Sequence, residues 1–185
     1  LVGPQGIGKM SVIEALGARM VEGRVPELLN DKRLIMIPIS HIISGDNPSA
    51  YYVRLTTIIQ EVARAGNIVL AFDGIEGIAG VKAGGDAGQD LADSLAEMTE
   101  QYGIPMIATT RTESYREHIN GSKLGGVLSK IDIIEVDENN AIQILEARVS
   151  GIEAQHSVFF TYAAIVQCVS MAKKFLQDMV LPESA

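Results

Sequence analysis

The chain has 185 residues, 47% of them hydrophobic, which suits one domain or a domain with a small appendage and allows a buried core. The formal net charge of −8 disfavours nucleic-acid binding, because affinity for phosphate backbones rests on Lys and Arg. No apolar run reaches the roughly 18–20 residues that cross a membrane, so we expect no membrane partner. The single cysteine, Cys168, indicates a reducing compartment, the cytoplasm or an organelle equivalent.

The first predicted element is the end of a strand, Leu1-Val2, followed by a glycine-rich loop and a helix over residues 9–22. The loop matches the pattern GxxxxGK, in which glycines let successive backbone N–H groups form a nest for phosphate oxygens. The positive end of the following helix points at the same place, and the lysine reaches the β- and γ-phosphates. The predicted phosphate-binding residues are Gly3, Pro4, Gln5, Gly6, Ile7, Gly8, Lys9 and Met10.

The last residue of this loop departs from the usual pattern. A Ser or Thr normally stands there and binds Mg²⁺ through its hydroxyl, whereas Met10 has a thioether that accepts weakly. Hard cations prefer oxygen ligands. The sequence therefore predicts ATP or ADP as the cofactor, with a Mg²⁺ ion that is poorly held if it binds at all.

Alternating strands and helices follow the loop. Apolar runs predict strands, and 3.6-residue periodicity predicts helices between them. The predicted strands are 34–39, 68–72, 104–108 and 131–136, the helices are 51–65, 90–102 and 114–119, and the loops are 44–49, 74–88 and 120–126. This alternation is typical of an α/β fold with a parallel sheet flanked by helices.

After Val136 the pattern changes to helices alone, over residues 138–149 and 163–176. We therefore predict an α/β domain over residues 1–136 and the start of a helical lid over residues 137–185. The abrupt ends of the chain, Leu1 and Ala185, suggest a piece of a longer protein.

Polar residues follow two of the predicted strands. Asp73 comes directly after IVLAF, and Thr109 and Thr110 follow the strand that ends at Ala108. Ligands of parallel sheets bind at the carboxyl ends of the strands, where the phosphate loop also lies. We predict Asp73 as the Mg²⁺ ligand and a catalytic residue. The adjacent Gly74, which stands where a catalytic Glu is usual, cannot act as a base.

The order of these pieces resembles the first AAA+ module of the Clp ATPases, the ClpB/ClpC group of disaggregases and unfoldases, over essentially the whole chain. Beyond the loop, the likeness covers EALGARMVEGRVPELLNDKRL (14–34), the turn into IVLAFD, IATTRTESYREHI (107–119) and the closing LPESA. The resemblance implies a P-loop NTPase of the AAA+ type in a hexameric ring of AAA+ subunits that threads protein substrates. It also implies that Thr109 or Thr110 is the catalytic sensor that orients the attacking water.

The departures from this family are systematic. Besides Met10 and Gly74, the paired arginines expected after Leu124 are replaced by GGVL, and the substrate-gripping loop corresponds to residues 46–50 (DNPSA), which contain no aromatic. Removing an arginine finger alone costs roughly 10³ to 10⁵ in rate in other NTPases. We therefore interpret the chain as a module that binds nucleotide and hydrolyses it weakly or not at all.

Two alternatives remain open from the sequence. In the first, the chain is an active ATPase in which Glu76 activates the attacking water in place of the missing Glu. In the second, the chain is a ring scaffold that has lost nucleotide binding and keeps only the oligomerising fold.

Overall fold

The computed structural model describes residues 1–45, 48–82, 90–176 and 179–184. The chain divides into two compact units. The first, which we call the α/β unit, comprises Leu1–Val2 and Met10–Asp132. The second, the helical unit, comprises Ile133–Ala185 together with the phosphate loop, Gly3–Lys9. The boundary predicted at residue 136 stays a prediction.

The α/β unit is built on a sheet whose described strands are β1 (Arg33–Pro38), β2 (Ile68–Asp73) and β3 (Met106–Ala108). They pair in parallel in the order β1-β2-β3, which confirms the predicted parallel sheet. Residues 69–72 of β2 are fully buried, as expected for a central strand with both faces covered. Isolated parallel bridges join Val2 to Thr110 and to Asp132, so Val2 lies beside the segment that leaves β3.

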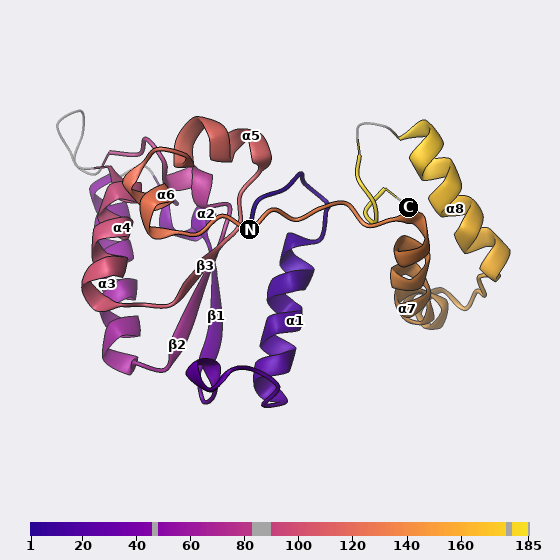
Figure 1. Cartoon of the computed structure of the whole chain (residues 1–185), viewed down its shortest axis with the longest axis horizontal. Helices are drawn as coiled ribbons and strands as arrows, with labels where there is room; N and C mark the ends of the chain where they lie inside the picture. The colour runs from indigo at the N-terminus through magenta and orange to yellow at the C-terminus, as the bar shows by residue number, and fades with distance from the viewer. Residues whose placement is uncertain (46–47, 83–89, 177–178, 185) are drawn as a thin grey trace. The chain divides into compact units, whose positions relative to one another are not determined.

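Helices lie on both sides of this sheet. Figure 1 shows α1 (Lys9–Val21) on one side of the strands and α3 (Pro48–Ala65) and α4 (Leu91–Tyr102) on the other. Asp90, the residue before α4, caps it by accepting from the backbone N–H of Ala92 at 2.7 Å. The core between helices and sheet is apolar, and its largest fully buried members include Leu55, Ile59, Leu70, Phe72, Ile75, Leu91, Leu95 and Leu124.

Short helices occupy several places where the sequence predicts none. Helix α2 (Ile39–Ile42) begins at the last residue of the predicted first strand, because Pro38 ends β1. A 3₁₀ turn, η2 (Ile75–Ile78), lies in the predicted irregular loop 74–88, whose residues 83–89 fall outside the described part. Another 3₁₀ turn, η1 (Glu27–Leu29), follows α1.

The segment 120–126, predicted as a loop, contains helix α6 (Lys123–Val127). Ser122 caps this helix by accepting from the N–H of Gly125 at 3.2 Å, and Leu124 is fully buried. The glycines favour a loop locally, but the cap and the buried leucine outweigh them. Upstream, the predicted helix 114–119 is a short α-helix, α5 (Thr112–Ser114), continued by a π-helical turn, η3 (Tyr115–Ile119).

The predicted strand 131–136 is wrong. Within the described residues, this segment forms a single isolated bridge, between Val2 and Asp132, in which the N–H of Val2 donates to the carbonyl of Ile131 at 2.8 Å. Ile131 and Ile134 are exposed, the latter by 82%. The alternation of apolar residues therefore does not mark a buried face here.

The helical unit contains α7 (Glu138–His156), longer than predicted, and α8 (Tyr162–Phe175). The helices begin at caps: Asp137 accepts from the N–H of Asn140 at 2.8 Å, and Thr161 accepts from that of Ala164 at 3.2 Å. The core of the unit is small and consists of Ala141, Val169, Ala172 and Leu181, with three partly buried residues packed against it. Across the described residues, no helix is both long and apolar enough to span a membrane.

Candidate nucleotide-binding site

The phosphate loop has the backbone that its glycines predict. Gly6 and Gly8 have φ angles of 79° and 97°, in the left-handed region that only glycine adopts readily. Helix α1 starts at Lys9, immediately after the loop, and its 13 residues give it a full macrodipole at the N-terminus. A side chain at Gly8 would meet nothing within 4 Å, so open space adjoins this part of the loop. These features fit a phosphate group.

The side chain of Lys9 lies along the backbone of the phosphate loop. The Nζ atom of Lys9 donates to the carbonyl oxygens of Gly3 and Pro4, at 2.7 and 2.6 Å. The ammonium thus lies against the loop backbone. This is a starting position from which it could exchange a carbonyl for a phosphate oxygen.

At the strand ends of the α/β unit, Asp73 and Thr109 meet as the sequence predicts. The hydroxyl of Thr109 donates to Asp73 Oδ1 at 2.6 Å and accepts from the N–H of Gly74 at 3.1 Å. Thr109 is buried, and its single hydroxyl hydrogen is committed to the carboxylate. Thr110 is also buried, but its hydroxyl donates to the carbonyl of Arg111 at 3.4 Å. The catalytic roles of these residues stay predictions.

A second carboxylate, Glu76, lies on η2 just beyond Asp73. Its Oε1 atom is 3.5 Å from Nε of Arg111, which follows the two threonines. The Glu76 side chain is only 17% exposed, and its Oε2 atom is buried and has no hydrogen-bond partner. A buried carboxylate oxygen is costly to leave unsatisfied. Because solvent does not reach this atom, a water or a polar ligand could bind it only after the Glu76 side chain moved.

Glycines stand where the catalytic Glu and one of the paired arginines of the family would be, at Gly74 and Gly125. Gly74 has a φ of 72°, so the position of the usual catalytic Glu is a left-handed turn. A Cβ at Gly125 would overlap the carbonyl oxygen of Ile119 and lie 3.2 Å from its carbon. Any side chain at that position would therefore require the turn before α6 to open. The described residues contain no cluster of three or more His, Cys, Asp or Glu able to hold a metal ion.

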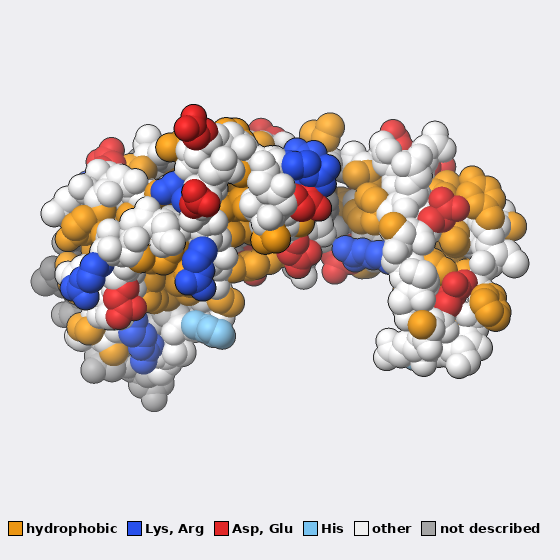
Figure 2. Space-filling model, turned by 90° about the horizontal axis from the view of Figure 1, so that it is seen from below, with side chains coloured by type: hydrophobic (Ala, Val, Ile, Leu, Met, Phe, Trp, Pro, Cys, Tyr) orange, Lys and Arg blue, Asp and Glu red, His pale blue; other side chains and the backbone are white. Residues whose placement is uncertain are grey.

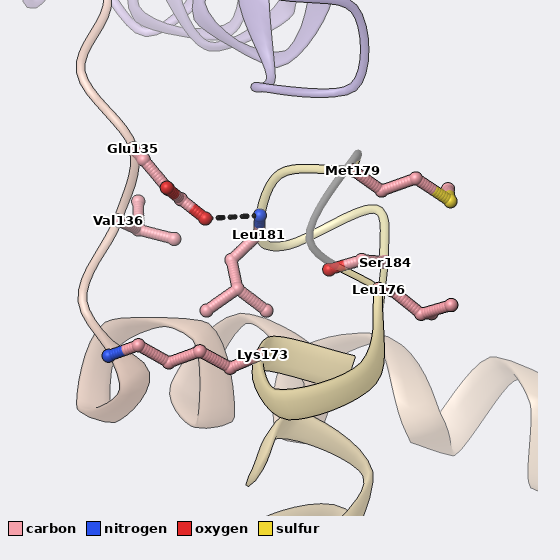
Figure 3. Close-up of a pocket in the computed structure, with 7 residues that line it drawn as sticks. All are labelled: Glu135, Val136, Lys173, Leu176, Met179, Leu181 and Ser184. Atoms are coloured by element: carbon pink, nitrogen blue, oxygen red, sulfur yellow. Dashed lines mark hydrogen bonds between the residues drawn. The ribbon is translucent and has the colours of Figure 1, made fainter. Parts of the chain in front are cut away.

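The helical unit contributes a further group to the phosphate loop. Its C-terminal turn borders a pocket of about 300 Å³, in which Glu135 Oε1 accepts from the N–H of Leu181 at 2.8 Å (Figure 3). In the same turn, two residues after Leu181, the side chain of Glu183 packs against the phosphate loop. A Cβ built on Gly6 would overlap the Glu183 side chain, at 2.8 Å from both Cβ and Cδ. The carboxylate thus lies directly beside a predicted phosphate-binding residue.

Comparisons with known proteins show which proteins the chain resembles. A model of the AAA lid domain matches residues 137–185. Over its whole length the chain is 32% identical to the chaperone protein ClpB of Helicobacter hepaticus and 30% identical to ClpC/MecB of Bacillus subtilis, a negative regulator of genetic competence. The chain is homologous to the ClpB and ClpC AAA+ chaperones. It spans 22% and 23% of the lengths of these two relatives.

Solved structures show the same AAA+ fold. The chain superposes on Hsp104 from a closed-state reconstruction with ATPγS and FITC-casein at a TM-score of 0.84 and 25% identity. It superposes on the Saccharomyces cerevisiae Hsp104–ADP complex at a TM-score of 0.86 and 24% identity. Each match covers 99% of this chain and 31% of the Hsp104 chain.

Two residues near the candidate site were not singled out from the sequence. Arg111 is an exposed side chain, 58% accessible, that also pairs with Glu76. Glu183 belongs to the closing LPESA segment, which the sequence analysis noted for its likeness to the Clp family and not as part of a site. No local pattern could connect it with Gly6, because the contact joins opposite ends of the chain. Residues 46 and 47 of the expected substrate-gripping loop lie outside the described part, and Pro48 already begins α3.

Proposed function

We propose that this chain is the nucleotide-binding AAA+ module of a Clp-type chaperone, and that it binds ADP or ATP while hydrolysing ATP weakly or not at all. The observation that carries the binding is the phosphate loop. Its left-handed glycines, the start of α1 at Lys9 and the Lys9 ammonium lying on the loop suit phosphate oxygens. In this proposal residues 3–10 hold the phosphates, with Lys9 as their cation.

The proposal of weak hydrolysis rests on the residues at the positions that usually bind Mg²⁺ and activate water. The hydroxyl that would help to hold Mg²⁺ is replaced by the Met10 thioether, and the base that would activate water is replaced by Gly74. The hydroxyl hydrogen of Thr109 is given to Asp73, so in this arrangement it does not orient a water. Asp73 remains as a carboxylate that could hold a metal ion. A single protein carboxylate such as Asp73 binds Mg²⁺ weakly without the hydroxyl that usually accompanies it.

The wider role of the module is proposed from its relatives. ClpB and ClpC/MecB carry the names of a chaperone and a competence regulator, and one Hsp104 structure was determined with casein. We propose that this chain forms part of a ring of AAA+ subunits, a hexamer by family resemblance, in the cytoplasm or an organelle equivalent. There it would supply subunit contacts or regulation while other modules act on protein substrates.

Calorimetric titration with ADP and ATP, with and without Mg²⁺, tests the proposal. Lys9→Ala removes a charged hydrogen-bond donor and should weaken binding by about tenfold to a hundredfold. A matched control is Lys32→Ala, which removes a half-buried lysine of the α/β unit that donates to the carbonyl of Gly66. If neither nucleotide binds the wild-type protein, the scaffold alternative holds instead.

A second candidate function rests on the unsatisfied Oε2 atom of Glu76. If the Glu76 side chain turns outward and this atom binds the attacking water, the chain is an active ATPase with a displaced base. Phosphate release by the assembled protein should then be measurable, and both Glu76→Gln and Lys9→Ala should abolish it. Turnover that survives Glu76→Gln would exclude this candidate, and robust turnover dependent on Lys9 would overturn the proposal of weak hydrolysis.

A further inference from the structure

The phosphate loop and the C-terminal turn of the helical unit are in direct contact through Glu183. The space into which a side chain at Gly6 would extend is filled by the Cβ, the Cδ and a carboxylate oxygen of Glu183. Gly6 is therefore required for two reasons, its φ of 79° and the presence of Glu183. Both residues belong to the same compact unit.

The turn that carries Glu183 is anchored on both sides of it. Leu181 is buried in the small core of the helical unit, and its N–H donates to Glu135 Oε1 at 2.8 Å (Figure 3). The N–H of Ser184 donates to the carbonyl of Val180 at 3.2 Å. These interactions fix the backbone on either side of Glu183, so the position of its side chain on the loop follows from the packing of the unit.

A carboxylate at this position opposes the loop's ligand. The backbone N–H nest and Lys9 attract anions, but Glu183 adds a full negative charge beside Gly6, near where phosphate oxygens would bind. Like charges a few ångströms apart repel, and the repulsion grows with the charge of the ligand. ATP carries one more negative charge than ADP. The carboxylate therefore penalises the triphosphate more than the diphosphate.

We propose that Glu183 is a specificity-determining residue of the phosphate loop, which lowers its affinity for nucleotide phosphates and biases the module towards ADP over ATP. This inference rests on the proposed function, since it assumes that the loop binds nucleotide. The carboxylate does not touch reacting atoms. It acts by its charge and by occupying the space beside Gly6.

The test is calorimetry of the full chain with ADP and with ATP, comparing wild type with Glu183→Gln. The substitution keeps the shape of the side chain and removes the charge, so affinity for ATP should rise by about tenfold and that for ADP by less. Glu146→Gln is the matched control, because it removes an exposed carboxylate from α7 of the same unit. It should leave both affinities within about twofold. The gain in Glu183→Gln should shrink at high salt, since salt screens exposed charges.

Two further variants keep the test decisive. Glu183→Asp retains the charge and should stay close to wild type, whereas Glu183→Lys reverses the charge and should exceed Glu183→Gln in ATP affinity. Equal ATP-to-ADP affinity ratios in wild type, Glu183→Gln and Glu183→Lys would overturn the inference and leave nucleotide binding intact. Absence of nucleotide binding in every variant would overturn the proposed function and this inference together.

Discussion

The two units of the chain are stabilised in different ways. The α/β unit has an extensive apolar core, and among its described residues Phe72 and eleven other large side chains are fully buried. Among the described residues of the helical unit, the buried cluster consists of Ala141, Val169, Ala172 and Leu181, and two of these are alanines. It relies in addition on helix caps, the Glu135–Leu181 hydrogen bond and an ion pair between α8 and α7.

Hydrophobic side chains lie at the surface of both units (Figure 2), and the smaller helical unit exposes more large ones for its size. The exposed ones in that unit include Ile152, Val158, Phe159, Phe160, Tyr162, Met171, Phe175, Leu176 and Met179. Apolar side chains that face water contribute nothing to the stability of the isolated unit. We therefore expect the helical unit to unfold at a lower denaturant concentration than the α/β unit, and the following substitutions test this contrast.

The largest effect is expected in the core of the α/β unit. Phe72→Ala removes a fully buried ring from β2 and should lower the free energy of unfolding by about 3–5 kcal/mol. Urea denaturation followed by circular dichroism measures it. Phe159→Ala is the matched control in the helical unit: Phe159 is 93% exposed, and the change should stay within about 0.5 kcal/mol. Comparable losses from the two substitutions would contradict the burial of Phe72 in the core and the exposure of Phe159.

A smaller effect is expected at the strand ends. Thr109→Val removes two partly buried hydrogen bonds, one from the N–H of Gly74 and one to the Asp73 carboxylate, which should cost about 1–3 kcal/mol in the same urea experiment. Thr109→Ser keeps the hydroxyl and should recover most of the loss. If Thr109→Val were as stable as wild type, these hydrogen bonds would not support the packing of β2 against β3.

A local effect is expected from the cap of α7. Asp137→Ala removes the acceptor for the N–H of Asn140 and should cost about 1 kcal/mol. Because the helical unit is expected to open separately, hydrogen exchange should accelerate in α7 while amides of β2 keep their protection. Asp90→Ala, at the matching cap of α4, should instead affect the α/β unit. Equal acceleration in both units after Asp137→Ala would show that they unfold as one.

The smallest effect is expected from exposed ion pairs. Hydrogen bonding to Glu138 and its charge raise the pKa of Lys173 above the usual 10.5, and Glu97 does the same to the pKa of Lys123. A raised lysine pKa contributes stability that is fully present below pH 10.5 and is lost as the pH rises through the folded-state pKa. Lys173→Met and Lys123→Met should therefore change the melting temperature only slightly at pH 7. Any difference should vanish in 1 M salt, where the Debye length falls to about 3 Å.

Much of the fold followed from local signals. The apolar run 68–72 predicts the buried strand β2, the periodicity of 51–65 predicts most of α3, and the spacing of glycines with Lys9 predicts the conformation of the phosphate loop. Asp73 and Thr109 could be placed at one edge of the sheet because parallel strands share their carboxyl ends. Each of these inferences depends on residues close together in sequence or on a general rule of topology.

The sequence by itself therefore determined the strands β1, β2 and β3, the conformation of the phosphate loop and the resemblance to the ClpB and ClpC chaperones. Only the tertiary structure decided that 131–136 is not a strand, that glycine-rich 123–127 is a helix, and that Glu76 pairs with Arg111. It also placed Glu183 on Gly6. These features arise from burial and charge contacts between segments distant in the chain, which outweigh local preference where the two conflict and which no short-range pattern encodes.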